Sequence, residues 1–198
     1  MTVQELFDFG DFPVLESERL RLRQLLPSDA PSVFRIRGDY EVTKYNGGLP
    51  YRTEEQAGSL IDAIASSYHD KRSVRWGITL KSDPRSTVIG MVGYNYWIRT
   101  DFRASIGYDL ARAYWGQGIM PEAVRAILEF GFTHMDLNRI EADASSQNVN
   151  SIRVLEKIGF KREGIQQEQY FEEGEFYDLV LFCLLRKHVT DKTGKLLK

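Results

Sequence analysis

The amino-acid sequence predicts an α+β fold, with about seven strands in a central sheet and about four flanking helices. Three observations support this class. Segments in which apolar and polar side chains alternate, as in a strand with one covered face, are interspersed with segments of helical spacing. The length of 198 residues allows one domain with a sizeable core. Hydrophobic residues make up 42% of the chain and charged residues 27%, as in ordinary globular proteins.

The N-terminal half is predicted to hold one strand, two helices and two further strands. Residues 1–16 show no clear period, so we interpret them as an N-terminal extension that packs over the surface or frays. Ser28 and Asp29 can cap the first helix, and Thr53 with Gln56 forms a capping box for the second. In chain order the elements are a strand at 19–23, helices at about 29–38 and 54–69, and strands at 74–80 and 87–98.

The C-terminal half alternates strands with helices and ends in two strands. Asn148 or Asn150 caps the last helix, and Gly159 ends it as a left-handed residue. The elements are a strand at 103–110, a helix from about Pro121 to Phe132, a strand at 139–144, a helix ending at Ile158, and strands at about 160–171 and 175–185. Residues 17–186 therefore form a single domain, and residues 187–198 form a polar C-terminal tail.

Composition excludes several classes of protein. A formal net charge of −2 gives no long-range attraction for nucleic acid or for an anionic membrane. Cys183 is the single cysteine and lies in an apolar run, so it predicts a buried packing role and excludes both disulfides and a cysteine zinc cluster. We expect no metal. The N-terminus lacks a basic region followed by an apolar run, and no apolar stretch approaches membrane-spanning length. We therefore expect a cytoplasmic protein, either a monomer or a homodimer.

A turn with two glycines joins the strand at 103–110 to the following helix. The turn reads Trp115-Gly116-Gln117-Gly118-Ile119-Met120, and Pro121 then occupies the first helical turn, where a missing N–H is tolerated. Free N–H groups at a helix N-terminus converge on one point, which suits a phosphate. The turn is neither a Walker loop nor a full dinucleotide fingerprint. Taken alone, it also fits a plain connection between a strand and a helix.

A second motif lies about thirty residues further on, in the segment from Asn148 to Phe160. It contains Asn148, Ser151, Lys157 and Gly159 at the spacing Asn-x-x-Ser-x-x-x-x-x-Lys-x-Gly-Phe. Together with the Tyr-Trp-Gly-x-Gly turn, this segment resembles the GNAT (GCN5-related N-acetyltransferase) superfamily. More narrowly it resembles the RimJ/RimL branch of ribosomal-protein N-terminal acetyltransferases. The resemblance covers roughly residues 17–186. Met120 departs from it, because a small residue usually ends the turn near the pyrophosphate.

The resemblance implies a GNAT fold and acetyl-CoA as co-substrate. The sheet of that fold is mixed and mostly antiparallel, and it splays between its fourth and fifth strands, here 103–110 and 139–144. The pantetheine arm then replaces the missing strand pairing and contacts the backbone of Tyr108 and Leu110, with the Leu110 N–H also aimed at the thioester oxygen. The other cofactor-binding residues that the resemblance implies are Trp115, Gly116, Gln117, Gly118, Ile119, Met120, Asn148 and Asn150.

The resemblance also implies direct attack of an amine on the thioester, with three candidate catalytic residues. Ser151 would protonate the leaving thiolate, although a helix-capping role fits it equally; Asn148 is likewise a pantetheine contact or a cap. The branch suggests a carboxylate base on the penultimate strand, but Tyr170 stands at that position. Glu168, two residues earlier on the same expected face, could act directly or through water, or be a solvated side chain. Glu141 and Asp109 are lesser candidates for the base.

The strength of the base bears on the acceptor. An α-amine with a pKa near 8 is about one tenth neutral at pH 7, whereas a lysine near 10.4 is neutral in about one molecule in 2,500, a difference of about 3 kcal/mol. A site without a strong base therefore fits a peptide or protein N-terminal α-amine best. Alternatives are a small amine (polyamine, aminoglycoside or amino acid) or a non-catalytic acyl-CoA-binding module. We expect the aromatic residues at 45–51, 96–97 and 170–171 around the acceptor.

Overall fold

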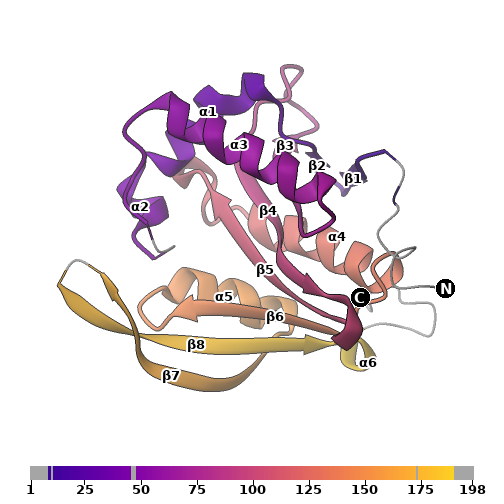
Figure 1. Ribbon diagram of the computed structural model, residues 1–198, viewed down its shortest axis with the longest axis vertical. Helices are drawn as coiled ribbons and strands as arrows, with labels where there is room; N and C mark the ends of the chain where they lie inside the picture. The colour runs from indigo at the N-terminus through magenta and orange to yellow at the C-terminus, as the bar shows by residue number, and fades with distance from the viewer. Residues whose placement is uncertain (1–8, 10, 46–47, 173, 190–198) are drawn as a thin grey trace.

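The computed structural model describes residues 9, 11–45, 48–172 and 174–189. Within them, eight strands form one sheet in the order β1-β2-β3-β4-β5-β6-β8-β7 (Figure 1). The strands are β1 (Leu15–Glu16), β2 (Leu20–Arg23), β3 (Val74–Leu80), β4 (Gly90–Ile98), β5 (Arg103–Leu110), β6 (Arg139–Ser145), β7 (Lys161–Glu172) and β8 (Glu175–Leu185). The α-helices are α1 (Ala30–Arg37), α2 (Tyr40–Thr43), α3 (Glu54–His69), α4 (Ile119–Thr133), α5 (Val149–Ile158) and α6 (Arg186–Val189).

The α+β class and the order of the long elements are confirmed, while the counts of strands and helices were too low. The additional strand, β1, lies inside the segment that we interpreted as an extension, and its two residues are too few to show an alternation. The additional helices, α2 and α6, have only four residues each. β4 begins at Gly90 instead of residue 87. Most of the expected C-terminal tail, residues 190–198, lies outside the described residues.

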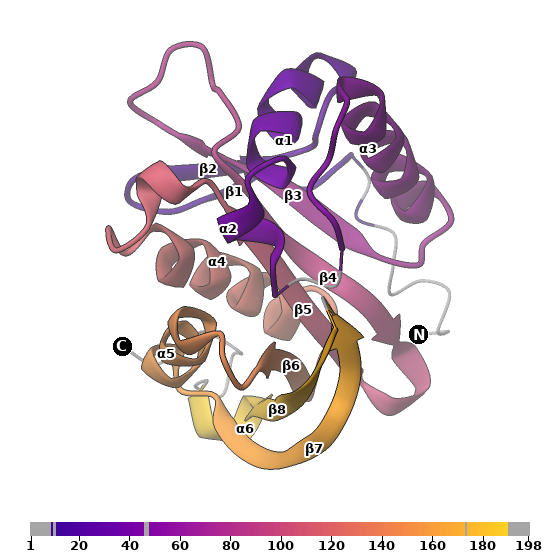
Figure 2. The ribbon, with the colours of Figure 1, turned by 90° about the vertical axis from the view of Figure 1, so that its left-hand side faces the viewer.

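Helices cover both faces of the sheet. α1 and α3 pack on one face against a small core that includes Leu25 and Met91. α4 and α5 pack on the other face against a larger core that includes Trp76 and Val92. Neighbouring residues on β4, Met91 and Val92, belong to different cores because side chains alternate along a strand. Figure 2 shows α1 and α3 together on one side of the sheet, and α4 on the other.

The segment before β1 packs against the larger core. The indole Nε1 of Trp76 donates a hydrogen bond of 2.6 Å to the Pro13 carbonyl. The ring of Phe12 lies 6.0 Å from that of Trp76 and 4.8 Å from that of Tyr68, centroid to centroid. The described part of the segment therefore contributes to the fold. In the described residues, each helix is too short or too polar to cross a lipid bilayer.

The sheet opens between β5 and β6, its one parallel pair in the described residues. Pairing is limited to Arg103 with Arg139, Ala104 with Ile140, and Ser105 with Glu141. Beyond these three pairs both strands continue, to Leu110 and to Ser145, without facing each other (Figure 1). The splay that we expected from the family resemblance is thus confirmed. β6 instead pairs along its whole length with β8 on its other side.

Candidate active site

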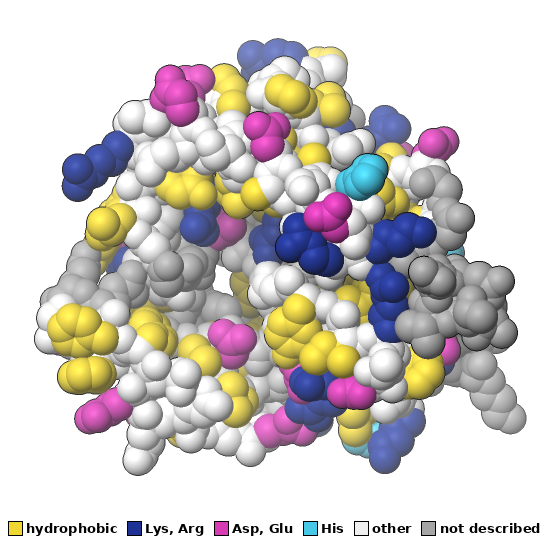
Figure 3. Space-filling model, viewed as in Figure 1, with side chains coloured by type: hydrophobic (Ala, Val, Ile, Leu, Met, Phe, Trp, Pro, Cys, Tyr) yellow, Lys and Arg dark blue, Asp and Glu magenta, His cyan; other side chains and the backbone are white. Residues whose placement is uncertain are grey.

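A cavity of about 1570 Å³ occupies the opening of the sheet. Its walls come from the ends of β5 and β6, the first turns of α4 and α5, the segment around α2, and residues of the β7–β8 hairpin. Figure 3 shows the molecule hollowed between the α2 region and the hairpin, in the same view as Figure 1. The two motifs found in the sequence meet here, because both α4 and α5 begin beside the opening.

The glycine turn has the backbone that an anion site needs. Gly116 and Gly118 have φ angles of +73° and +75°, in the left-handed region that side chains disfavour. Gly118 is the N-cap of α4, and Pro121 lies in the first turn of that helix, as predicted. Both glycines line the cavity. Met120 is 5% exposed and packs into the larger core while also bordering the cavity, so its side chain is held away from the solvent side of the turn.

Arg19 braces the turn from the outside. Its guanidinium forms an ion pair of 2.7 Å with Glu122 in the first turn of α4, and donates a hydrogen bond of 3.0 Å to the Gln117 carbonyl. Ser17 donates a further hydrogen bond of 2.7 Å to Glu122. Gln117 does not line the cavity; its side-chain amide donates to the Ala113 carbonyl. Gln117 is thus the one predicted cofactor residue that the structure leaves outside the cavity.

The backbone of β5 faces the opening at the two predicted residues. The Ala111 N–H donates to the Ile89 carbonyl beside β4. Because backbone groups alternate in direction along a strand, those of Leu110 and Tyr108 point the other way, toward the diverging β6. The Leu110 carbonyl accepts a hydrogen bond of 2.8 Å from the Trp115 indole, which fixes this ring beside the turn. The Leu110 N–H and both backbone groups of Tyr108 are therefore directed at the cavity.

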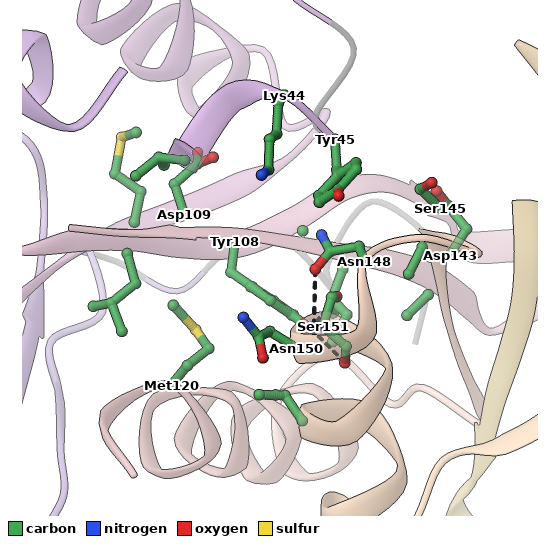
Figure 4. Close-up of a pocket in the computed structure, with 18 of the residues that line it drawn as sticks. Lys44, Tyr45, Tyr108, Asp109, Met120, Asp143, Ser145, Asn148, Asn150 and Ser151 are labelled. Carbon is green, nitrogen blue, oxygen red and sulfur yellow. Dashed lines mark hydrogen bonds between the residues drawn. The ribbon is translucent and has the colours of Figure 1, made fainter. Parts of the chain in front are cut away.

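Ser151, Asn148 and Tyr108 form a connected group at the start of α5 (Figure 4). The Asn148 Oδ1 accepts from the Ser151 N–H at 3.0 Å, so Asn148 is the helix cap and Asn150 is not. The Ser151 hydroxyl oxygen lies 2.8 Å from that of Tyr108. Burial raises the pKa of Tyr108 to about 12, and the Ser151 hydrogen bond opposes that rise. Asn148, Asn150, Ser151 and Tyr108 all line the cavity.

Three carboxylates of β5 and β6 differ in their surroundings. Asp109, 7% exposed, forms an ion pair of 3.0 Å with Arg37 of α1. Glu141 is held by Arg139 at 2.7 Å and by Arg103 at 3.1 Å. Burial acts to raise the pKa of Glu141, but hydrogen bonds from Tyr96 and Arg139 outweigh it and lower that pKa.

Asp143 is the third carboxylate, and it lines the cavity (Figure 4). Its side chain is open to the cavity, yet the surrounding protein removes part of its hydration and raises its pKa above the ordinary value of 3.8. No cation pairs with it in the described part of the chain. A carboxylate of raised pKa beside a cavity suits proton transfer better than one locked in an ion pair.

The predicted pair of Glu168 and Tyr170 is separated by a bulge. The register between β7 and β8 shifts between Gln166 and Tyr170, and Glu168 has a φ of +48°. The Glu168 N–H donates to the Asp178 carboxylate at 2.9 Å. Tyr170 lines the cavity and stacks on Tyr177 with ring centroids 5.5 Å apart, whereas Glu168 is exposed outside it. The expectation that Glu168 and Tyr170 share one face was wrong, because the bulge breaks the two-residue period.

The aromatic residues expected around the acceptor are only partly there. Tyr45 lines the cavity, as do Tyr170 and Phe171 from the hairpin. Residues 46–47 of the expected loop lie outside the described residues. Tyr96 and Trp97 do not line the cavity: Tyr96 donates its hydroxyl hydrogen to Glu141, and Trp97 lies under Arg99 at 4.9 Å. That part of the expectation was wrong.

Comparison with known proteins settles the family. The family described as "Acetyltransferase (GNAT) domain" matches residues 19–161. The chain belongs to the GNAT acetyltransferase family. Among curated relatives, this acetyltransferase is 34% identical to the uncharacterized N-acetyltransferase YoaA of Bacillus subtilis (strain 168), over 88% of this chain and 98% of that protein. Both the family and the N-acetyltransferase relatives identify the protein as an acetyltransferase enzyme.

Two further relatives of this GNAT protein have names that include a substrate or ligand. The spermidine N(1)-acetyltransferase of Escherichia coli (strain K12) is 22% identical over 84% of this chain and 86% of that protein. The solved structure of Mycobacterium smegmatis RimJ in complex with CoA-disulfide has a TM-score of 0.82 at 22% identity, covering 93% of both chains. The RimJ likeness shows a shared fold.

Several cavity residues of this acetyltransferase were not singled out from the sequence. Asp143 had a signal, since the alternation of residues 139–144 places it on the same face as Glu141, which we did name as a lesser candidate. Arg75 had a similar signal, because the alternation along β3 places it on the face opposite Val74 and Trp76. Asn95 had none, because it lies at a bulge in β4, and a bulge leaves no regular sequence pattern.

Proposed function

We propose that this acetyltransferase transfers the acetyl group of acetyl-CoA to the N-terminal α-amine of a peptide or protein. The proposal is supported by the residues that converge on the opening of the sheet and by the bases available there. It assigns a binding role to the glycine turn, a proton-donating role to the Tyr108 and Ser151 pair, and a proton-accepting role to Asp143. Glu168 is replaced in this account by Asp143, because Glu168 stands outside the cavity.

The residues around the opening fit acetyl-CoA. The left-handed glycines of the turn let backbone N–H groups approach a pyrophosphate at the N-terminus of α4. The Tyr108 backbone and the Leu110 N–H, which do not pair with β6, would hold the pantetheine amides, and the Asn148 side-chain NH₂ would add a donor. Acetyl-CoA supplies an activated acyl group as a thioester.

The side chains around the opening can manage the protons of the transfer. A nitrogen–carbon bond forms while the carbon–sulfur bond of the thioester breaks, so the amine loses one proton and the sulfur gains one. Asp143, on the face covered by α1 and α3, accepts the proton of the amine. The Ser151 hydroxyl, on the α5 side, gives its proton to the sulfur and receives one from Tyr108. Solvent in the open cavity then reprotonates Tyr108 and takes the proton from Asp143, so the site returns to its starting state. The Leu110 N–H stabilises charge on the carbonyl oxygen.

We choose an α-amine as the acceptor because of the bases that line the cavity. Among the described residues that line it, carboxylates are present and histidines are not. A carboxylate is a weak base, even with a raised pKa, and serves an amine that is already partly neutral near pH 7. An α-amine meets that condition and a lysine side chain does not. Arg37 and Arg75 in the same cavity oppose a polyamine, which is a polycation.

The test measures thiol release from acetyl-CoA with three acceptors. These are a short lysine-containing peptide with a free N-terminus, the same peptide with its N-terminus acetylated, and spermidine. We expect the free-amino peptide to be the fastest, with a rate that rises with pH through the pKa of its α-amine near 8. Faster turnover of the blocked peptide or of spermidine would contradict the assignment. Binding of CoA without turnover of any of the three would favour a binding module.

A further inference from the structure

A row of three residues crosses the sheet on the face that α1 and α3 cover. Arg75 of β3 pairs with Gly93 of β4, which in turn pairs with Gly107 of β5. Paired residues point to the same face, so the side chain of Arg75 is followed by two positions with no side chain. At Gly93 a Cβ would lie 2.5 Å from the Arg75 Cα, so this glycine lets β3 and β4 approach closely.

Asp143 continues this row across the opening of the sheet. Ser105 pairs with Glu141, and Gly107 and Asp143 each lie two residues further along these parallel strands. Asp143 therefore points to the same face as Arg75. A cation and a carboxylate thus stand at the two ends of a row whose middle is glycine. Basic side chains, with an acidic one among them, lie on the upper side of the hollow, and a further acidic side chain lies on its lower side (Figure 3).

The amide of Asn95 covers the row at Gly107. A Cβ at Gly107 would lie 2.8 Å from both terminal atoms of the Asn95 amide, so that space belongs to Asn95. The Arg75 guanidinium donates a hydrogen bond to Asn95 Oδ1, which leaves the Asn95 NH₂ as a second donor. Both side chains line the cavity. Together they present a guanidinium and an amide NH₂, the donors that bind a carboxylate.

Among the described residues, the charge of Arg75 is only partly balanced. The carboxylate of Asp109 acts electrostatically on Arg75, and it already pairs with Arg37 at 3.0 Å. Two guanidinium groups therefore share one carboxylate, which leaves a net charge of about +1 on this wall of the cavity. In the described residues Arg75 forms no ion pair of its own. Burial and the like charge of Arg37 lower the pKa of Arg75, while Asp109 opposes this change.

We propose that the acceptor carries a carboxylate close to the amine that is acetylated, and that this carboxylate binds the Arg75–Asn95 pair while the amine faces Asp143. The inference rests on the acetyl transfer proposed above and names the class of its acceptor. The carboxylate belongs either to a free amino acid or to an acidic side chain at the start of a peptide. Both present an amine and a carboxylate a few bonds apart, and Arg75 and Asn95 present their donors over Gly107, on the strand beside that of Asp143.

The test compares two matched pairs of acceptors at saturating acetyl-CoA. The first pair is serine and serinamide, and the second is Asp-Ala-Ala-amide and Asn-Ala-Ala-amide. We expect kcat/KM of the acid, expressed per neutral amine, to exceed that of its neutral partner by about 10-fold or more in at least one pair, because the neutral partner lacks a charge-assisted hydrogen bond. The pair that shows the preference identifies the source of the carboxylate. Equal values within both pairs would overturn the inference and leave the acetyl transfer standing.

Substitutions locate the preference on the protein. Arg75→Gln should abolish the difference between acid and neutral acceptor, and Asn95→Ala, at an exposed position, should reduce it. Arg72→Gln is the matched control, because it removes the same charge three residues away, where Arg72 pairs with Asp70 on the surface. Unchanged CoA affinity by calorimetry verifies that each variant is folded. A preference that survives both Arg75→Gln and Asn95→Ala would overturn the inference.

A binding measurement decides the case in which none of these acceptors is acetylated. That result would contradict the proposed acetyl transfer to α-amines. The recognition of a carboxylate is then tested by binding alone, without turnover. N-acetylaspartate and N-acetylasparagine amide, which has no carboxylate, are titrated into the CoA-loaded protein by calorimetry. Tighter binding of the acid, lost in Arg75→Gln, supports the inference. Equal binding, or no binding of either compound, overturns it.

Discussion

The hydroxyl oxygens of Tyr108 and Ser151 lie 2.8 Å apart and connect β5 to α5 across the floor of the cavity. The two residues are far apart in the chain: Tyr108 belongs to the strand before the glycine turn, and Ser151 belongs to the second motif found in the sequence. Because burial raises the pKa of Tyr108 to about 12, this hydroxyl keeps its proton throughout the pH range in which enzymes are assayed. The pair therefore suits the proton-donating role that we propose for it.

Ser151→Ala should lower kcat by the order of 100-fold while leaving CoA affinity nearly unchanged, because an acid catalyst is lost and a binding group is not. The helix cap survives this change, since it is the Asn148 side chain that accepts from the Ser151 N–H. Steady-state kinetics and calorimetry measure the two effects. Ser146→Ala, at an exposed position in the preceding turn, is the control. Near-normal kcat in Ser151→Ala would rule out the donor role.

Gly118→Asn should raise the KM for acetyl-CoA by about 10-fold or more, because it adds a side chain where the backbone approaches the pyrophosphate. Asparagine tolerates the left-handed conformation that Gly118 adopts at a φ of +75°, so the change tests access more than backbone strain. Gly174→Asn is the matched control: that glycine has a φ of +89° and open space around it, in the β7–β8 turn. Equal KM values for the two variants would contradict a pyrophosphate site at the turn.

Asn148→Asp separates the two roles of this residue. Aspartate caps helices as well as asparagine does, so thermal stability should change little, whereas Asn148→Ala should cost about 1 kcal/mol. The side-chain NH₂ is lost in both variants, and both should bind CoA more weakly if that group contacts pantetheine. Thermal unfolding and CoA calorimetry give the two readouts. Tight CoA binding in both variants would show that Asn148 caps the helix and does not contact pantetheine.

Asp143→Asn should lower kcat by the order of 100-fold and at the same time stabilise the fold at neutral pH. Burial raises the pKa of Asp143 in the folded protein, so the folded state binds its proton more tightly than the unfolded state does. Its contribution to stability therefore falls as pH rises from the ordinary value of 3.8 through the raised one, and the amide removes that cost. The activity of the unmodified enzyme should fall as pH drops through the same window.

Glu141→Gln, on the same face of β6, should change stability in the opposite direction: it should destabilise the fold at neutral pH. The pKa of Glu141 is lowered, so its ionised form contributes stability at neutral pH that the amide would lose.

Glu168→Gln tests the base that the sequence suggested, and it should leave kcat within about two-fold because the residue is outside the cavity. A large loss of kcat in Glu168→Gln, with normal kcat in Asp143→Asn, would reverse the assignment.

The parts of the site that follow from local pattern were predictable from the sequence. The glycine turn and the strands β5 and β6 depend on neighbouring residues, and each was found where expected; of the two candidate caps for α5, the structure selects Asn148. Contacts between residues on different strands could not be predicted, because they depend on the register in which the strands pair. The contact of Tyr108 with Ser151 spans 43 residues, and the row from Arg75 to Asp143 spans four strands.

Irregular backbone explains the remaining differences. The bulge in β7 moved Glu168 off the face predicted from its spacing to Tyr170, and the bulge in β4 turned Asn95 toward Gly107. β1 has two residues and α2 has four, so neither is long enough for a period to be recognised. These four features surround the cavity or lie at the sheet edge, where regular patterns carry least weight.

The central claim is that the enzyme acetylates an α-amine in preference to a lysine side chain. Its most direct test is one peptide that carries both groups, Asp-Ala-Lys-Ala-amide, incubated with the enzyme and limiting acetyl-CoA. Tandem mass spectrometry of the product then locates the acetyl group, and the released CoA is counted. The account predicts the acetyl group on the N-terminal nitrogen, with one CoA released for each acetyl transferred. An acetyl group on the lysine nitrogen would contradict it.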